Sequence, residues 1–479
     1  MTRDKYEKHL FPSLKEARRR MQKETKQIRY QLPDYLLGIG NNKKYHIKTY
    51  GCQGNLADSE KMAGLLEATG FRPTEFENEA DIIILNTCAV RENAENRIFG
   101  ELGRIKNLKK HNPDLLIALC GCMPQEESVV SKVMEKYPHV DIVFGTHNLH
   151  RLGEYIHDAY FSKEKVVRVY SKEGEIVEGV PMKRAFPQKA WVNIMYGCDE
   201  FCSYCIVPYT RGKERSRHYR DIIAEVEELA ESGYKEVTLL GQNVNAYGKD
   251  FTDIRYTFAD LLLDLNRIDI PRIRFVTAHP RDLDQRTIEV MALRGNIMPH
   301  IHLPVQSGSN KILKKMNRKY TREAYLELID ALREHIPDIA ITTDIIVGFP
   351  GESDEDFAET LDMVKRAGFE GAFTFIYSPR SGTPASKYKD DLPADVKKQR
   401  LQELNKLVNE GYLNGNKRFE GKTAKVLVDG PSGKNANMLT GYSEHNKLVN
   451  FPGEKSLTGE IVDVKIEKAY TWHLRGIIE

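Results

Sequence analysis

Three cysteines lie close together on one short stretch of the chain, in the spacing C-x3-C-x2-C: Cys198, Cys202 and Cys205. Iron–sulfur clusters are held by cysteine thiolates, often close in sequence, whereas structural zinc sites take four ligands, usually from separated C-x2-C pairs. A four-iron cluster bound by three cysteines keeps one iron open for a substrate or cofactor. The spacing favours such a cluster, and a zinc site completed by His218 is the alternative.

A second set of cysteines is spread along the first part of the chain. Cys52, Cys88 and Cys122 each follow an apolar, strand-like run, over residues 46–50, 81–85 and 115–119. The carboxyl ends of parallel strands form the ligand crevice of an open sheet. We therefore expect the three thiols to converge on a metal centre, with three unrelated buried cysteines as the alternative. Cys120 is expected to be a buried thiol that points elsewhere.

The elements that position this second set alternate along the sequence. Helices are expected over 59–68, 92–108 and 125–136, and a further strand over 140–144. Apolar strands separated by helices predict an open parallel α/β sheet, covered on both faces, in a domain of residues 45–160. A linker over 161–188 follows, with a hairpin expected from Val166 to Val180.

The first set of cysteines opens a longer α/β region, residues 189–415. Strands are expected over residues 190–195, 236–240, 273–278, 300–305, 340–347 and 372–377. Helices are expected between them, near 219–232, 258–268, 285–294, 322–334 and 355–367. Such repeated units predict a partial (β/α)6 barrel of the TIM type, with its chemistry at the carboxyl ends of the strands. Cys198 leaves the first strand on that face.

Polar residues near the same strand ends are candidate cofactor ligands. They are Gln242, Asn243, Gln306 and Asp344. Ordinary loop residues are the alternative for each of them. Arg217, in the basic stretch after the thiol loop, could bind a carboxylate or a phosphate. A solvated run of charge is the alternative there.

The two ends of the chain differ from its centre. A helix over 395–414 leads into residues 416–479, where short runs alternate apolar and polar residues between Gly and Pro. This pattern predicts a small all-β barrel or sandwich, a type that often binds oligonucleotides. Residues 1–44 carry twelve Lys or Arg against five Asp or Glu, densest at Arg18–Arg20. We expect a flexible, solvated extension, with a weak RNA-binding arm as the alternative.

Composition narrows the class of protein. With 71 Lys plus Arg against 69 Asp plus Glu, a nucleic-acid partner must be met by local basic patches. The apolar runs fall short of the ~20 residues that cross a bilayer, and no secretory signal is evident. We expect a cytoplasmic protein with no membrane association. Seven cysteines in such a chain favour metal ligands over disulfides.

Several motifs add a family resemblance. GCDEFCSYC resembles the CxxxCxxC signature of radical S-adenosylmethionine (SAM) enzymes. YGCQGN, ILNTCAVRENAENR, CGCMPQ, HLPVQSGS and TDIIVGFPGE resemble the methylthiotransferase subfamily, and the C-terminal part resembles its TRAM module. The resemblance implies that SAM binds the open iron of a 4Fe-4S cluster held by Cys198, Cys202 and Cys205. It also implies that Tyr204 lies against the adenine.

The same resemblance implies a second, auxiliary 4Fe-4S cluster on Cys52, Cys88 and Cys122. The implied reaction is radical methylthiolation of C2 of N6-dimethylallyladenosine, at position 37 of tRNA. SAM would then serve both as methyl donor and as radical source. The implied partners are the tRNA anticodon stem-loop, a flavodoxin- or ferredoxin-like electron donor, and a sulfur or cluster supplier. We expect a monomer.

Other substrates and one other class stay open. The segment NLADSE, residues 55–60, is similar to relatives that methylthiolate an aspartate of a ribosomal protein. Threonylcarbamoyl adenosine in tRNA is a further possible substrate. The alternative of another class is a zinc-dependent RNA-binding protein without catalytic activity.

Overall fold

The structure is a computed structural model that describes residues 10–17, 25–89, 92–172, 174–433 and 435–479. The chain divides into two compact units. The N-terminal unit contains the described residues up to Ala185 together with Tyr196–Phe201 and Cys205–Arg217. The C-terminal unit contains Phe186–Met195, Cys202–Tyr204 and His218–Glu479. The thiol loop therefore contributes residues to both units.

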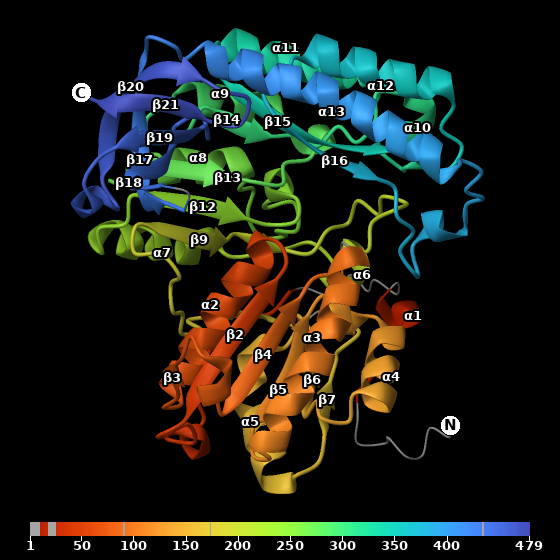
Figure 1. Ribbon diagram of the computed structural model, residues 1–479, viewed down its shortest axis with the longest axis vertical. Helices are drawn as coiled ribbons and strands as arrows, with labels where there is room; N and C mark the ends of the chain where they lie inside the picture. The colour runs from red at the N-terminus through yellow and green to blue at the C-terminus, as the bar shows by residue number, and fades with distance from the viewer. Residues whose placement is uncertain (1–9, 18–24, 90–91, 173, 434) are drawn as a thin grey trace. The chain divides into compact units, whose positions relative to one another are not determined.

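The N-terminal unit is built on a six-stranded parallel sheet with the strand order β3-β2-β4-β5-β6-β7 (Figure 1). The strands are β2 (Lys44–Tyr50), β3 (Arg72–Pro73), β4 (Ile82–Thr87), β5 (Leu116–Gly121), β6 (Ile142–Phe144) and β7 (Val166–Arg168). The central strands β4 and β5 are buried along their whole length. Burial on both faces explains why their sequences are continuous apolar runs.

Helices cover both faces of this sheet. They are α2 (Gln53–Ala68), α3 (Glu92–His111), α4 (Glu127–Lys136) and α5 (Leu152–Ser162). Ile82 and Ile84 of β4 pack in one core with α2 and α5, whereas Ile83 and Leu85 pack in a second core with α3 and α4. The alternation along one strand thus separates the two cores, as the pleat requires. The predicted open sheet, covered on both faces, is confirmed.

The predicted hairpin from Val166 to Val180 is wrong. β7 instead extends the parallel sheet by pairing with β6, and β8 (Ile176–Glu178) pairs in parallel with β1 (Gln27–Arg29). β7 and β8 each pair with a strand whose backbone groups are free to receive them, and they do not pair with each other. They therefore do not form a hairpin, although they are close in the sequence. Part of the predicted N-terminal extension is structured, because β1 and a 3-10 turn at Asp34–Leu36 belong to this unit. Arg18–Arg20 lie outside the described residues.

The C-terminal unit begins with six parallel strands in two groups, β13-β12-β9 and β14-β15-β16. The strands are β9 (Lys189–Asn193), β12 (Glu236–Leu240), β13 (Arg272–Phe275), β14 (His300–His302), β15 (Ala340–Val347) and β16 (Ala372–Ile376). The helices are α7 (Tyr219–Glu231), α8 (Phe258–Leu265), α9 (Gln285–Ala292), α10 (Asn310–Lys315), α11 (Arg322–His335) and α12 (Asp354–Ala367). One large core joins strands and helices, so the predicted partial barrel is confirmed. The short helix α10 was not expected from the sequence.

The end of the chain folds into a closed β-barrel with the order β17-β18-β19-β21-β20. A long helix, α13 (Ala394–Lys417), leads into it, and the strands are β17 (Thr423–Ser432), β18 (Asn435–Ser443), β19 (Leu448–Pro452), β20 (Ile461–Ala469) and β21 (Leu474–Ile478). The predicted small all-β module is confirmed as a barrel. Closure removes the sheet edges that an isolated small sheet would expose.

Two arginines of β13 fasten this barrel to the strands of the same unit. Arg272, 2% exposed, donates from Nη1 to Tyr442 O and from Nη2 to Lys425 O, both at 2.9 Å. Arg274 donates to Ser443 O at 2.6 Å and to Glu444 O at 2.9 Å. Its Nε also donates to Glu236 Oε2 at 2.9 Å. Backbone carbonyls of the barrel thus receive four charge-assisted hydrogen bonds.

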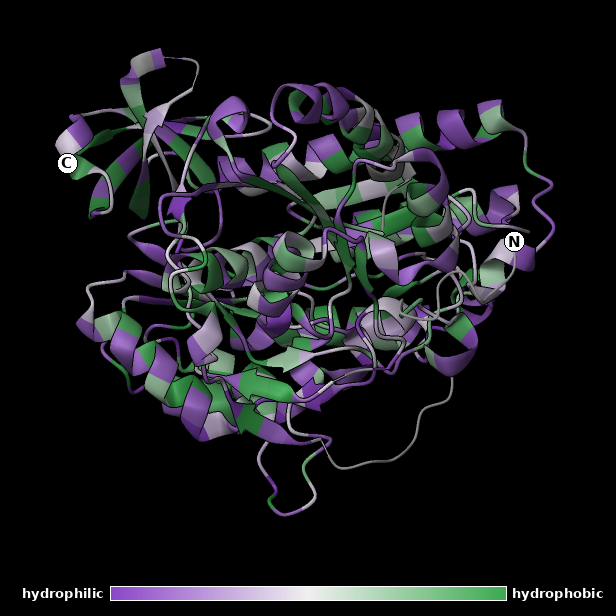
Figure 2. Ribbon diagram, turned by 90° about the horizontal axis from the view of Figure 1, so that it is seen from below, coloured by the Kyte–Doolittle hydropathy of each residue, from purple (hydrophilic) through white to green (hydrophobic). Residues whose placement is uncertain are grey.

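Hydropathy along the ribbons follows this architecture (Figure 2). Hydrophobic segments lie on the strands, and the helices show hydrophilic and hydrophobic residues in alternation. Within the part of the chain that the structure describes, we find no helix with the length and apolar character needed to span a membrane.

Candidate iron–sulfur and SAM site

The thiol loop begins at a glycine that cannot be replaced without strain. Gly197 has φ +77°, and a Cβ there would lie 1.9 Å from Lys213 O. The next residue is held by a backbone hydrogen bond of 3.1 Å from Cys198 N to Gly212 O. Phe201 also adopts a positive φ of 46°. The backbone is thus sharply turned at both places, which fixes the direction in which the thiols leave the chain.

Cys202 is the cysteine of this loop that lies in the C-terminal unit. Its Sγ accepts a hydrogen bond of 3.3 Å from Arg318 Nη1, and the two residues are 116 positions apart in the chain. Ser203 anchors the same segment, because its Oγ donates to Lys315 O at 2.8 Å and its N donates to Met316 O at 2.9 Å. Arg318 had no local signal in the sequence. Only the fold brings it to the thiol.

Tyr204, the predicted adenine-binding residue, packs in the C-terminal unit. Its ring lies edge-on to Phe349, with ring centroids 6.5 Å apart. Phe349, Met316 and Tyr377 form the buried cluster against which it rests. One side of the ring is therefore fixed by packing, and its use in binding adenine stays a prediction.

The structure brings together the thiols of Cys52, Cys88 and Cys122 in the N-terminal unit. Each follows the carboxyl end of a strand, namely β2, β4 and β5. Burial, with smaller contributions from the nearby thiols of Cys88 and Cys52, raises the pKa of the Cys122 thiol to about 12, although Arg211 opposes the shift. Three soft sulfur donors at one sheet edge are a donor set that fits an iron–sulfur cluster.

A buried amide network holds this set in place. Asn55, fully buried, donates from Nδ2 to Asn86 Oδ1 at 3.0 Å and to Thr87 O at 3.1 Å. Its Oδ1 accepts a contact of 3.4 Å from the Cys52 thiol. Asn86 returns a hydrogen bond of 2.7 Å to Asn55 O. One side chain thus ties the start of α2, which carries Cys52, to the end of β4, which precedes Cys88.

Arg211 touches the same set from another segment. Its Nε donates to Cys122 Sγ at 3.3 Å, and its Nη2 lies 2.7 Å from Asp58 Oδ2 on α2. Burial alone would lower the pKa of Arg211, but Asp58, Cys122 and Cys52 raise it well above its ordinary value. The guanidinium is therefore charged. It lies six residues after Cys205, on the stretch that continues the thiol loop.

Cys120 faces away from the set, as expected. Its Sγ lies 3.6 Å from Met62 Sδ, in the core between the sheet and α2. Cys122 packs in a different cluster, with Ala89 and Ile206. The reversal between the two comes from Gly121, which has φ +95° and interrupts the pleat of β5.

The predicted polar ligands lie along the half-barrel strands. Asn243 donates from Nδ2 to Asp282 Oδ2 at 2.6 Å, and Asp344 Oδ1 lies 3.4 Å from His302 Nε2. Gln306 has φ +69°, and its backbone bridges to Ile345. Gln242 follows the end of β12 and is half-buried. All four lie in one unit near strand ends, and their contact with a cofactor stays a prediction.

Arg217 is engaged within the N-terminal unit. Its Nε donates to Glu178 Oε1 at 2.7 Å and its Nη2 donates to Glu178 Oε2 at 2.6 Å. Both side chains are buried. This two-pronged ion pair ties β8 to the stretch that follows the thiol loop. A SAM-binding role for Arg217 would have to be shared with this carboxylate.

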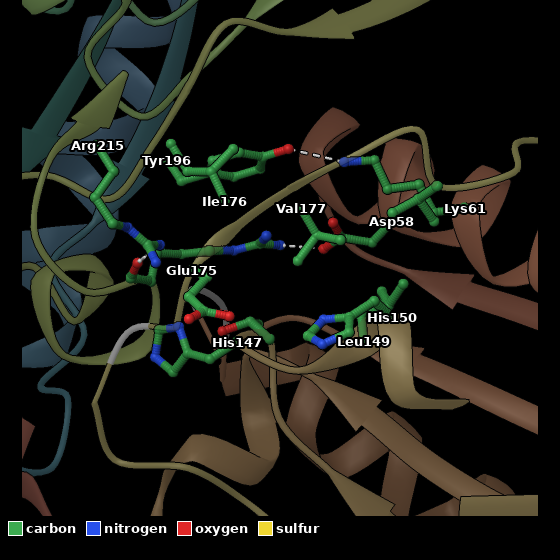
Figure 3. Close-up of a pocket in the computed structure, with 13 residues that line it drawn as sticks. Asp58, Lys61, His147, Leu149, His150, Glu175, Ile176, Val177, Tyr196 and Arg215 are labelled. Carbon is green, nitrogen blue, oxygen red and sulfur yellow. Dashed lines mark hydrogen bonds and ion pairs between the residues drawn. The ribbon is translucent and has the colours of Figure 1, made fainter. Parts of the chain in front are cut away.

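A pocket of about 70 Å³ lies in the N-terminal unit, and Arg211 is one of the residues that line it (Figure 3). Asp58, Lys61, His147 and Arg215 are among the residues that line it. Lys61 Nζ donates to Tyr196 OH at 2.8 Å, which Figure 3 marks as a dashed line. The walls of the pocket therefore carry charged side chains, of which Asp58 and Arg211 form an ion pair.

Three family models match consecutive parts of the chain. "Uncharacterized protein family UPF0004" matches residues 44–145, "Radical SAM superfamily" matches residues 192–364, and "TRAM domain" matches residues 417–478. The first range carries Cys52, Cys88 and Cys122, and the second carries the thiol loop.

Close relatives span nearly the whole chain. A tRNA-2-methylthio-N(6)-dimethylallyladenosine synthase of Geobacillus kaustophilus (strain HTA426) is 58% identical over 98% of this chain and 90% of its own length. A protein of the same name from Bacillus cereus (strain B4264) is 59% identical over 97% of this chain and 92% of its own length. This chain belongs to the tRNA-2-methylthio-N(6)-dimethylallyladenosine synthase family. The family resemblance inferred from the motifs is confirmed.

Solved structures agree on the fold of this family member. The radical SAM methyltransferase TsrM from Kitasatospora setae, solved with tryptophan and a SAM analogue, matches with a TM-score of 0.52. The match covers 72% of this chain and 75% of that one at 15% identity. At this identity the likeness concerns the fold alone.

Proposed function

We propose that this chain is a radical SAM methylthiotransferase that modifies C2 of N6-dimethylallyladenosine at position 37 of tRNA. The observation that carries this function is identity of 58% over nearly the whole length of a synthase named for that product. The radical SAM and TRAM matches agree with a SAM-dependent enzyme that acts on RNA. The tRNA substrate is preferred over a ribosomal-protein aspartate because the relatives share the tRNA-directed name.

The two sets of thiols would hold two 4Fe-4S clusters. Cys198, Cys202 and Cys205 would hold the cluster that binds SAM, and Cys52, Cys88 and Cys122 would hold the auxiliary one. When bound, these groups and SAM supply the one-electron chemistry and the sulfur transfer, which side-chain acids and bases cannot provide at an aromatic C–H bond. Tyr204, Gln242, Asn243, Gln306 and Asp344 are the proposed SAM-binding side chains.

The contribution of the chain itself is binding and orientation. Asn55 fixes the direction of the Cys52 thiol, and the turn at Gly197 fixes that of Cys198. Arg272 and Arg274 donate hydrogen bonds to the TRAM barrel from a strand of the same unit. An RNA bound by the barrel would therefore be held at a fixed place on that unit. The anticodon loop must present an unstacked base, as enzymes that act on bases require.

Further partners follow from the reaction. Each turnover needs an electron donor, of the flavodoxin or ferredoxin kind, and a supplier of sulfur or of clusters. We propose a cytoplasmic monomer, in the compartment where tRNA and these donors are found.

Nucleoside analysis of tRNA tests the proposal. Deletion of the gene in its host should remove the 2-methylthio group and leave N6-dimethylallyladenosine to accumulate. The intact gene should restore the modification, and the Cys88→Ala gene, as matched control, should not. Unchanged 2-methylthio nucleoside in the deletion strain would show that the substrate is another one.

Metal analysis separates the enzyme from a zinc-dependent RNA-binding protein. After anaerobic reconstitution we expect about eight iron and eight sulfide per chain, counting four of each per cluster. Stoichiometric zinc without sulfide would rule out the enzymatic function.

A further inference from the structure

In each set of thiols, one cysteine sulfur accepts an N–H from a buried arginine. Arg318 Nη1 lies 3.3 Å from Cys202 Sγ in the C-terminal unit. Arg211 Nε lies 3.3 Å from Cys122 Sγ in the N-terminal unit. Both guanidinium groups stay protonated at any physiological pH. The two arginines differ in what else they touch.

Arg318 meets only neutral groups besides the thiol. Its Nη2 donates to Pro304 O at 3.0 Å, and its Nε donates to Tyr320 OH at 2.8 Å. Its guanidinium also lies over the Tyr320 ring, 5.0 Å from the centroid. The residue is 8% exposed. Within the described part of the chain, no carboxylate contacts this guanidinium, which donates to the Cys202 sulfur.

Arg211 is balanced by a carboxylate. Asp58 Oδ2 lies 2.7 Å from its Nη2, and both side chains are about nine-tenths buried. The carboxylate therefore offsets part of the positive charge that Arg211 places near Cys122. The same hydrogen bond to sulfur is therefore accompanied by a net positive charge in one set and by a neutral pair in the other.

We propose that Arg318 is a positioning residue that raises the reduction potential of the cluster bound through Cys202. This inference rests on the proposed function, because it takes the cluster at the thiol loop as given. Reduction adds one electron and hence one negative charge, which a nearby cation and an N–H donor to sulfur stabilise. The low-dielectric surroundings strengthen that effect. No bond to the arginine forms or breaks.

A redox titration followed by electron paramagnetic resonance tests the proposal. The full chain with Cys52, Cys88 and Cys122 all changed to Ala retains only the thiol-loop set. In this parent, Arg318→Met should lower the reduced-to-oxidised ratio about tenfold at the potential where the parent is half reduced. A tenfold change corresponds to 59 mV for one electron. Arg318→Gln, which is neutral but keeps an N–H donor, should also lower the reduced-to-oxidised ratio.

The matched control is Arg322→Met, four residues further along. Arg322 bonds to Glu359 O and pairs with Asp362, and neither contact reaches a thiol. This variant should leave the ratio within twofold of the parent. The reciprocal variant is Asp58→Asn in a chain whose Cys198, Cys202 and Cys205 are Ala. In that chain the charge of Arg211 has lost its carboxylate partner, and we expect a higher reduced-to-oxidised ratio for the auxiliary cluster.

Three outcomes of these measurements would contradict the inference or the proposed function. An unchanged ratio in Arg318→Met or Arg318→Gln, at four iron per chain, would overturn the inference. Loss of iron in both variants, with normal iron in Arg322→Met, would also overturn it, because the arginine would then be structural. A parent without any iron–sulfur signal would instead contradict the proposed function.

Discussion

Removing Arg272 should loosen the TRAM barrel from its own unit. The change Arg272→Met keeps most of the side-chain volume but deletes two charge-assisted hydrogen bonds, to Tyr442 O and Lys425 O. A hydrogen bond to a charged group contributes about 1.5–3 kcal/mol, so their loss costs about 3–6 kcal/mol. Burial lowers the pKa of Arg272 to about 10, and the nearby charge of Arg274 lowers it as well. Because this charge is costly to bury, its removal recovers part of the lost free energy of unfolding. We expect a net destabilisation of about 2–4 kcal/mol.

Urea unfolding of the apo protein measures this change, and limited proteolysis shows whether the C-terminal barrel is released first. The matched control is Arg267→Met, whose partner Asp264 is one helical turn away and whose side chain is 71% exposed. An exposed pair of this kind contributes about 0.2–1 kcal/mol. The change Arg272→Met should raise the KM for tRNA, whereas the rate of SAM cleavage without tRNA should stay at the wild-type value. A free energy of unfolding equal to that of Arg267→Met would refute the reasoning.

Three further changes test other parts of the structure. Burial lowers the pKa of His445 to about 4, so the stability it contributes is present above the ordinary value of about 6.5 and is lost as pH falls toward 4. The change His445→Gln should flatten that decline, by on the order of 2 kcal/mol between pH 7 and pH 4, in urea titrations. Cys88→Ala should retain SAM cleavage but give no methylthio product, whereas Cys198→Ala should lose both; equal loss of cleavage would argue against separate clusters. Gly121→Ala should destabilise the apo protein by more than about 1 kcal/mol, because its Cβ would lie 2.3 Å from Thr87 O at a positive φ; Gly103→Ala, where a Cβ meets nothing within 4 Å, is the control.

Local patterns predicted most of the architecture. The buried strands β4 and β5 are unbroken apolar runs, and the cysteine that follows each of them lies at the carboxyl edge of the sheet, as predicted. Its role as a metal ligand stays a prediction. The same reasoning failed for Val166 to Val180, because the partner of a strand depends on which sheet edge, distant in the sequence, is available for pairing. The sequence pattern around β8 contains no information that it pairs with β1.

The supporting residues of the site were beyond sequence reasoning for the same reason. Arg318 meets Cys202 across 116 positions, and Asn55 meets Asn86 across 31. Arg217 was predicted from its place in a basic run, yet its guanidinium is paired with Glu178, which gave no signal of its own. Charge runs show where cations are dense, but the fold decides which carboxylate each one meets.

The turn at Gly121 determines how many sulfur ligands the auxiliary set can offer. Cys120 and Cys122 are two residues apart, and an unbroken strand would point both thiols to the same side. Cys120 continues the alternation of Leu116 and Ala118 into the core beside α2, where its thiol meets Met62. Without the turn at Gly121, the Cys122 thiol would point into that same core, and the proposed auxiliary set would be left with two thiols. The number of proposed ligands thus depends on a residue that has no side chain.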